Sequence, residues 1–112
     1  MTHPVFEFLA QRSSTPISAI SEPAPQGAEL EELLKVAARV PDHGRLTPWR
    51  FILYRGDVRH KVGEYLATRA EEREGPLNES RKDQERARFA RAPLVIGVVS
   101  SPVAHERIPE WE

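Results

Sequence analysis

Residues 41–51 have the sequence Pro-Asp-His-Gly-Arg-Leu-Thr-Pro-Trp-Arg-Phe, which predicts a rigid polar loop that leads directly into a strand. Two prolines restrict the backbone on either side of His43 and Arg45. The aromatic and β-branched residues that follow predict a strand over 49–55. Because binding residues are often carried by loops on a rigid scaffold, we expect a small-molecule site at this loop.

A second strand is expected at residues 94–99, Leu-Val-Ile-Gly-Val-Val, which form a continuous apolar run. A strand without alternation is apolar on both faces, so it needs cover on both sides and partners at its edges. Two strands alone make a marginal sheet. We therefore expect either that another chain completes the sheet or that the C-terminal half of the protein is missing.

The N-terminal part of the sequence predicts two helices. Pro4 can begin a short helix that ends near Arg12. Residues 21–27 contain two prolines and a glycine and are expected to form an ordered linker. Apolar residues at helical spacing from Ala28 onward predict a second helix, which Pro41 ends.

Two more helices are expected between the two strands. Asp57 is predicted to cap the first of them, and Ser80 to cap the second, which runs to about Arg91. A loop over residues 75–78 separates the two helices. The buried stripe of the first is predicted to consist of Val58, Val62, Tyr65 and Leu66.

The composition is that of one soluble domain. The chain has 112 residues, 39% of them hydrophobic, and 16 basic against 17 acidic residues give a formal net charge of -1. This balance implies no polyanion partner, so no nucleic acid is expected. No cysteine is present, and we find neither a signal peptide nor an apolar run long enough to cross a membrane. We therefore expect a cytoplasmic protein without a membrane partner.

Several other function classes fit the sequence poorly. The four histidines do not have the spacing of a metal site, so no metal ligand is predicted. The basic residues between 69 and 91 alternate with acidic ones, which is typical of a solvated helix pair with ion pairs rather than of a nucleic-acid surface. No glycine-rich phosphate loop is found either.

The motif in residues 41–51 also carries a family resemblance. Pro-Asp-His at 41–43 followed by Pro-Trp-Arg-Phe at 48–51 resembles the loop of the nitroreductase family, in its small NAD(P)H-dependent, FMN-using branch. Gln11-Arg12-Ser13 resembles the opening motif of these proteins, with Gln11 where one branch of the family has arginine. Residues 22–25, residues 91–96 and the downstream His105, Pro109 and Trp111-Glu112 also agree in order and spacing.

The resemblance implies an α+β fold, an α/β/α sandwich whose central, mainly antiparallel sheet is here incomplete. It also implies a homodimer with FMN at the interface, NAD(P)H as electron donor, and nitro compounds, quinones or similar small molecules as acceptors. By position, Gln11, Arg12, Ser13, Arg39 and His43 would bind FMN, the last two reaching the FMN shared with the other subunit. Because the flavin carries the chemistry, no catalytic side chain is predicted.

The family continues beyond Trp-Glu for roughly half a domain. We therefore expect residues 1–112 to be a single nitroreductase-like domain truncated at its C-terminus. Two functions remain open at this stage. One is an FMN-dependent oxidoreductase, and the alternative is a non-catalytic truncated remnant or flavin-binding and dimerisation module.

Overall fold

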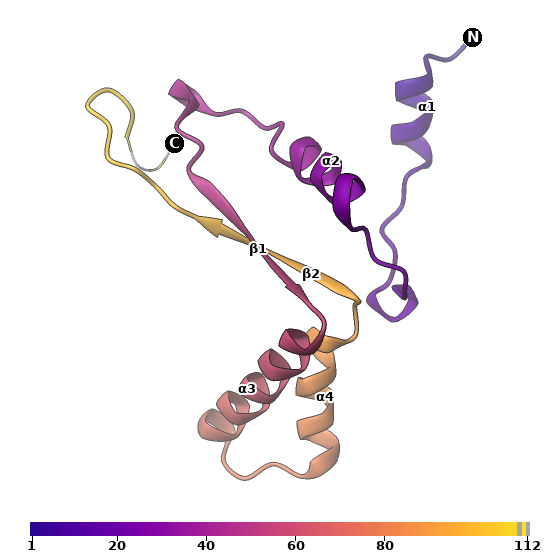
Figure 1. The fold of residues 1–112 in the computed structure, drawn as a ribbon, viewed down its shortest axis with the longest axis vertical. Helices are drawn as coiled ribbons and strands as arrows, with labels where there is room; N and C mark the ends of the chain where they lie inside the picture. Colours follow the sequence, from indigo (N-terminus) through magenta and orange to yellow (C-terminus); the bar gives the residue numbers. More distant parts are fainter. Residues whose placement is uncertain (110, 112) are drawn as a thin grey trace.

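Two antiparallel strands form the centre of the computed structural model, which describes residues 1–109 and 111 (Figure 1). Strand β1 (Trp49–Arg55) pairs with β2 (Leu94–Ser100) along its whole length, from Trp49 opposite Ser100 to Arg55 opposite Leu94. Both strands lie where the sequence predicts them. The helices around them make the mixed α+β fold expected of part of a nitroreductase-like domain.

The sheet carries apolar side chains on both faces, as the unbroken run in β2 predicts. Phe51 and its partner Val98 lie on one face, and Tyr54 and its partner Val95 lie on the other. The ring of Tyr54 contacts Phe89 edge to face, with ring centroids 5.0 Å apart. Within the described residues, however, the sheet has only these two strands, so most of its apolar side chains are only half-buried.

Helices α3 (Asp57–Glu74) and α4 (Glu79–Ala90) form an antiparallel hairpin between the two strands. The buried residues of α3 are the small ones, Gly63, Ala67 and Ala70, whereas Val58 and Tyr65 of the predicted stripe are exposed. The prediction of that stripe is therefore wrong at these two positions. Small residues at the crossing let the helix backbones approach closely, and this rotates the larger side chains away from the contact.

The caps of this hairpin also differ from the prediction. Helix α3 has Gly56 at its N-cap, and Asp57 is already the first helical residue. Helix α4 begins at Glu79, one residue before Ser80, because the side chain of Asn78 accepts a hydrogen bond from the Arg81 amide at 2.9 Å. Asparagine is as good an N-cap as serine, so its position before Glu79 decides where the helix starts.

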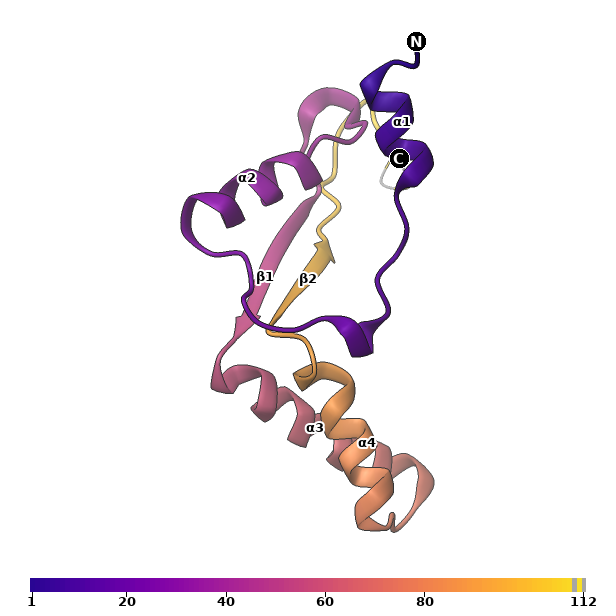
Figure 2. The same cartoon turned by 90° about the vertical axis from the view of Figure 1, so that its right-hand side faces the viewer.

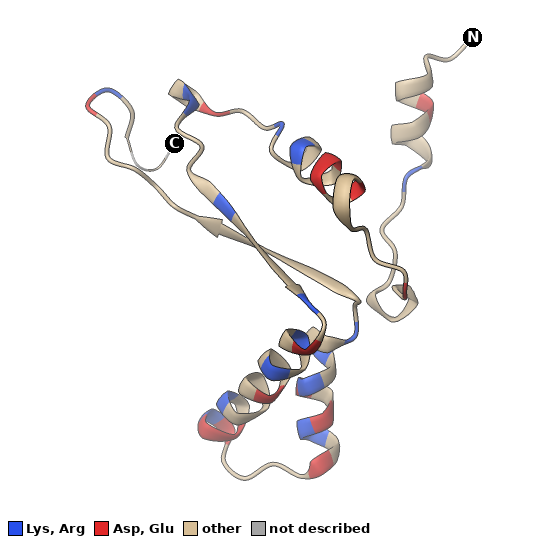
Figure 3. Cartoon of the chain, viewed as in Figure 1, with Lys and Arg blue, Asp and Glu red and all other residues tan. Residues whose placement is uncertain are grey.

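A network of ion pairs covers the hairpin, where the basic and acidic residues alternate along both helices (Figure 3). Arg86 contacts Glu64 of α3 at 2.8 Å and Asp83 of its own helix at 2.8 Å. Arg81 pairs with Glu74 and with Glu85, whose residue is only 6% exposed. The hydrogen bond from Arg81 lowers the pKa of the Glu85 carboxyl, against the effect of burial. The predicted ion-paired helix pair is confirmed.

The N-terminal elements are packed much less tightly. Helix α1 (Pro4–Gln11) has no buried residue and lies apart from the sheet in Figure 1. A 3-10 turn, η1 (Ile17–Ala19), and the linker lead to α2 (Gly27–Ala37), which buries Leu30 (Figure 2). Helix α2 ends at Ala37, before Pro41, because the residue preceding a proline is disfavoured in helical geometry.

The chain on its own is open rather than compact. Its radius of gyration is 18.7 Å, against about 13 Å for a compact domain of this length. Its accessible surface of 9296 Å² exceeds by about 3,000 Å² that of a compact monomer of the same mass. Among the described residues, the buried apolar side chains are those of Leu30, Ala67, Ala70, Pro93 and Ile108. None of the described helices is both long and apolar enough to cross a membrane.

We predict that Gly63→Ala destabilises the hairpin. A β-carbon at this position would lie 2.7 Å from the backbone oxygen of Arg86, so the helices must separate. The cost of overpacking, about 1–3 kcal/mol, exceeds the gain of up to about 1 kcal/mol in helix propensity. Urea unfolding followed by circular dichroism measures the change. Lys61→Ala, at an exposed site of α3, is the control, and a more stable Gly63→Ala chain would contradict the close contact.

We also predict that the hairpin loses stability in acid through Glu85. Because the folded pKa of Glu85 lies below its unfolded value, its stabilising effect is complete above the unfolded pKa and is lost as the pH falls through the folded one. The wild-type urea midpoint should therefore fall between about pH 5 and pH 3, and Glu85→Gln should flatten this dependence. Glu31→Gln, an exposed acid of α2, is the control. Equal pH slopes in wild type and Glu85→Gln would contradict this role.

Candidate functional site

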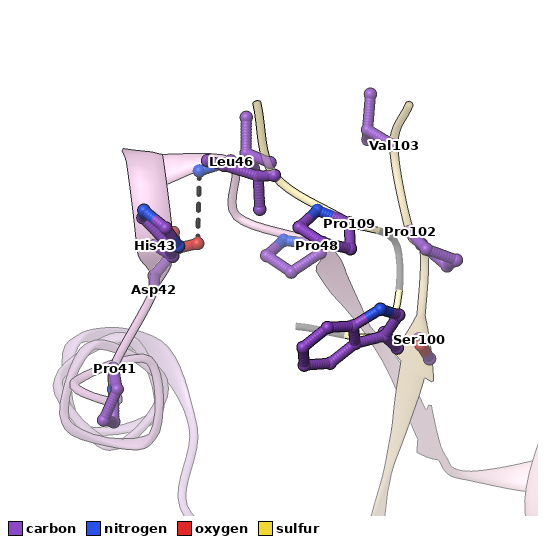
Figure 4. A pocket seen from close by; sticks show the side chains of 11 residues that line it. Pro41, Asp42, His43, Leu46, Pro48, Ser100, Pro102, Val103 and Pro109 are labelled. Atoms are coloured by element: carbon purple, nitrogen blue, oxygen red, sulfur yellow. Dashed lines mark hydrogen bonds between the residues drawn. The ribbon is translucent and has the colours of Figure 1, made fainter. Parts of the chain in front are cut away.

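The loop over residues 41–48 is held together by one carboxylate. Asp42 Oδ1 accepts a hydrogen bond from the Leu46 amide at 3.1 Å (Figure 4). Its Oδ2 accepts one from the Thr47 amide at 2.8 Å. The Arg45 amide donates to the carbonyl oxygen of Asp42 at 3.1 Å, which closes a 3-10 turn, η2 (His43–Arg45). Asp42 therefore fixes the loop from its first turn to the start of β1.

The backbone of this loop is strained. Gly44 has a φ of +73°, and two residues with side chains, Arg45 at +53° and Thr47 at +45°, also lie in the left-handed region. Such conformations cost free energy for residues other than glycine and persist only where their surroundings hold them. The two bonds to Asp42 provide part of that constraint.

A second segment, residues 101–109, lies across the end of the loop. It leaves β2 next to the start of β1, where the Ser101 amide donates a hydrogen bond to the carbonyl oxygen of Pro48 at 2.8 Å. Ile108 is its buried side chain, 7% exposed, and lies against Gly44. The loop and this segment form the two walls of the site, with Asp42 and His43 on one side and Pro102 and Val103 on the other (Figure 4).

Between the two walls lies a cavity of about 190 Å³. Its lining is mostly apolar, and His43 and Asp42 supply its charged and titratable groups. This is smaller than the roughly 300–1,000 Å³ of a usual ligand pocket, so it can hold only part of a larger ligand. The residues that line it are Pro41, Asp42, His43, Leu46, Pro48, Ser100, Pro102, Val103, Ile108, Pro109 and Trp111.

A second hollow of about 420 Å³ lies on the outer side of the same loop and is lined by Arg39, Asp42 and Arg45. Within residues 1–109 and 111, neither arginine side chain forms an ion pair, and the carboxylate of Asp42 is bonded to backbone amides. Unpaired guanidinium groups attract anions and bind phosphate with two parallel hydrogen bonds. The donors beside this hollow therefore fit the phosphate or the anionic ring edge of a flavin.

The structure brings two of the five predicted flavin contacts together. Arg39 and His43 lie before and within η2 and line adjacent hollows. Gln11 is the last residue of α1, and Arg12 and Ser13 follow it in extended, exposed chain, where Arg12 Nη2 donates to Ser14 Oγ at 3.4 Å. Figure 1 shows that the end of α1 lies apart from the 41–48 loop. The flavin-binding role of Gln11, Arg12 and Ser13 therefore remains a prediction. Within one copy of the chain, these three residues do not lie beside Arg39 and His43.

Sequence reasoning did not assign two residues that the structure places at the site. Arg45 lies in the motif of residues 41–51, but the sequence gives it no binding role of its own. Its left-handed backbone cannot be predicted from the sequence. Ile108 stands among prolines and polar residues with no periodic pattern. The available signal for the burial of Ile108 is that it is a large apolar residue standing alone in a polar segment.

Comparison with known proteins gives a consistent result. The family model described as the Nitroreductase family matches residues 10–111. The chain is 34% identical over 110 residues to the "Putative NAD(P)H nitroreductase YdjA" of Escherichia coli strain K12. The matched region covers 95% of this chain and 56% of that protein. It is 34% identical over 94 residues to a "Putative NAD(P)H nitroreductase" of Haemophilus influenzae, covering 83% of this chain and 50% of that one. The chain thus spans about half the length of the curated relatives it matches.

Proposed function

The chain belongs to the nitroreductase family, and on that premise we propose that it forms part of an FMN-dependent oxidoreductase. In this proposal, electrons pass from NAD(P)H by way of FMN to nitro compounds, quinones or similar acceptors. The observation that carries the proposal is the 41–48 loop, whose rigid backbone presents His43 to one hollow and Arg45 to the next, where Arg39 lies just before the loop. The relatives' names support the NAD(P)H donor.

The chain's own residues would bind and orient the flavin. FMN, when bound, supplies the hydride and electron transfer, so the protein needs to supply position and charge. Arg39 can hold a phosphate or face the ring edge on which negative charge develops, and His43 can donate a hydrogen bond, more strongly when protonated. Pro48, Pro102 and Pro109 line the cavity and limit the access of water to it.

We further propose that two copies of the chain share each site. Gln11, Arg12 and Ser13 would come from one subunit, and Arg39 and His43 from the other. The separation of α1 from the loop within one chain supports this arrangement. The surplus of about 3,000 Å² of accessible surface is larger than the roughly 800 Å² that each partner buries in a standard interface.

Turnover tests the proposed function directly. We expect the purified chain to be yellow, to release FMN on denaturation, and to oxidise NAD(P)H when a nitroarene or quinone is added. A preparation that stays colourless during FMN titration would refute FMN binding by this chain. FMN binding without NAD(P)H oxidation would instead support a flavin-binding and dimerisation module, the second candidate, with which the open structure agrees.

We predict that Arg12→Ala, Arg39→Ala and His43→Ala each weaken FMN binding by about tenfold, because each removes a charge-assisted hydrogen bond worth about 1.5 kcal/mol or more. Fluorescence quenching of FMN measures the dissociation constant. Arg69→Ala, which removes an exposed arginine of the hairpin paired with Glu72, is the matched control and should leave affinity unchanged. Unchanged affinity in all three site variants would remove the assignment.

Mixing two variants tests whether the site is shared. Arg12→Ala and His43→Ala subunits that are unfolded and refolded together should form heterodimers in which one of the two sites is intact. About a quarter of all sites would then bind FMN at wild-type affinity. If each site were built within one chain, no intact site would appear in the mixture.

A further inference from the structure

The C-terminal segment 101–109 has one large side chain that is buried. Ile108 is 7% exposed, whereas Val103, which lines the same cavity, is 53% exposed. The segment has neither helix nor strand, and its backbone bond to the core runs from the Ser101 amide to Pro48 at the opposite end. Within residues 1–109 and 111, the burial of Ile108 is thus a contact that joins the distal part of this segment to the 41–48 loop.

The surface that receives Ile108 is the backbone of Gly44. A β-carbon built at Gly44 would lie 2.4 Å from Cδ1 of Ile108, closer than any real contact, and 3.9 Å from its Cγ1. The left-handed φ of +73° at Gly44 also favours glycine. The other glycines with positive φ, such as Gly75, have no atom within 4 Å of such a β-carbon. Because Cδ1 is the end of a flexible side chain, a β-carbon at position 44 would displace Ile108 rather than the loop backbone. Gly44 thus has a close packing contact in addition to its left-handed backbone.

The contact falls at the centre of the strained loop. Gly44 lies between His43 and Arg45, and the left-handed Arg45 follows directly. Asp42 bonds the Leu46 and Thr47 amides through its carboxylate and the Arg45 amide through its carbonyl oxygen, so its bonds are made to backbone that follows Gly44. Ile108 adds a side-chain contact at Gly44 itself.

We propose that Ile108 is a positioning residue, which holds the 42–47 loop in its binding conformation by packing on Gly44. The C-terminal segment and the loop then order together, and displacing Ile108 releases His43 and Arg45 from their places beside the two hollows. The role of this contact in flavin binding rests on the proposed function, whereas its effect on the loop does not.

Hydrogen exchange on the full chain tests the effect on the loop. Ile108→Ala should raise the exchange rates of the Leu46 and Thr47 amides by about tenfold and leave the α3 and α4 amides unchanged. Val103→Ala, in the same segment and cavity, is the matched control and should change neither. Unchanged exchange at Leu46 and Thr47 in Ile108→Ala overturns the proposal, and so does a uniform rise over the whole chain, which indicates general destabilisation.

A double-mutant cycle tests the contact itself. Gly44→Ala should also raise the amide exchange rates of Leu46 and Thr47. This increase should be larger than the increase that Gly75→Ala causes in the amides around residue 75. Ile108→Val removes Cδ1 and leaves Cγ1, so the added methyl group at position 44 then fits at ordinary contact distance. The effect of Gly44→Ala should therefore shrink several-fold in the Ile108→Val background. Additive effects would show that Ile108 and Gly44 do not act through each other, which overturns the proposal.

FMN titration separates this proposal from the proposed function. If wild type binds FMN, Ile108→Ala should weaken binding by about threefold or more, and Ile108→Val should stay near wild type. Equal affinity in wild type and Ile108→Ala would overturn the positioning role even if exchange rises. If wild type does not bind FMN, the proposed function fails, and the exchange and double-mutant results alone decide whether Ile108 holds the loop.

Discussion

The antiparallel pairing of β1 with β2 is the constraint on which the rest of the structure depends. Its register places Trp49 opposite Ser100, so the segment that enters β1 and the segment that leaves β2 emerge at the same end of the sheet. The Ser101–Pro48 hydrogen bond continues the pairing by one step beyond the strands. The 41–48 loop and the 101–109 segment therefore meet, although about 60 residues separate them in sequence. A shift in this register would separate the two walls of the cavity.

The opposite end of the sheet serves a structural role. There the chain leaves β1 at Arg55 and returns to β2 at Leu94 through the α3–α4 hairpin. Small buried residues and ion pairs join α3 to α4, and the Tyr54–Phe89 contact joins α4 to the sheet. The hairpin thus connects the two strands at one end, and the candidate binding residues lie at the other end, where the backbone is irregular.

The strands and helices could be predicted from the sequence because their signals are local. The apolar run 94–99, the aromatic and β-branched residues of 49–55 and the helical spacing in 28–38 each act within one element. The predicted caps Asp57 and Ser80 were wrong by one or two residues because neighbouring Gly56 and Asn78 could serve as well. The stripe of α3 was wrong because packing against α4 selects small residues at the crossing, and that preference comes from the partner helix.

The motif in residues 41–51 predicts a rigid polar loop, and the structure has one, but the pattern does not indicate how the loop is held. It gives Asp42 no role, whereas in the structure its two oxygens organise the loop backbone. The packing of Ile108 on Gly44 is a tertiary contact between segments without periodicity, so no pattern in either segment could indicate it.

The strain in the loop explains why these contacts must come from outside it. Arg45 and Thr47 have left-handed backbones that an isolated peptide would leave for a lower-energy conformation. A loop of this kind keeps its shape only if several contacts restrain it together, since each alone is worth about 1 kcal/mol. Asp42 restrains its backbone amides, β1 fixes its exit through Trp49, and Ile108 covers its turn at Gly44. The geometry of the arginine and histidine side chains in the motif thus depends on residues that have no chemistry of their own to perform.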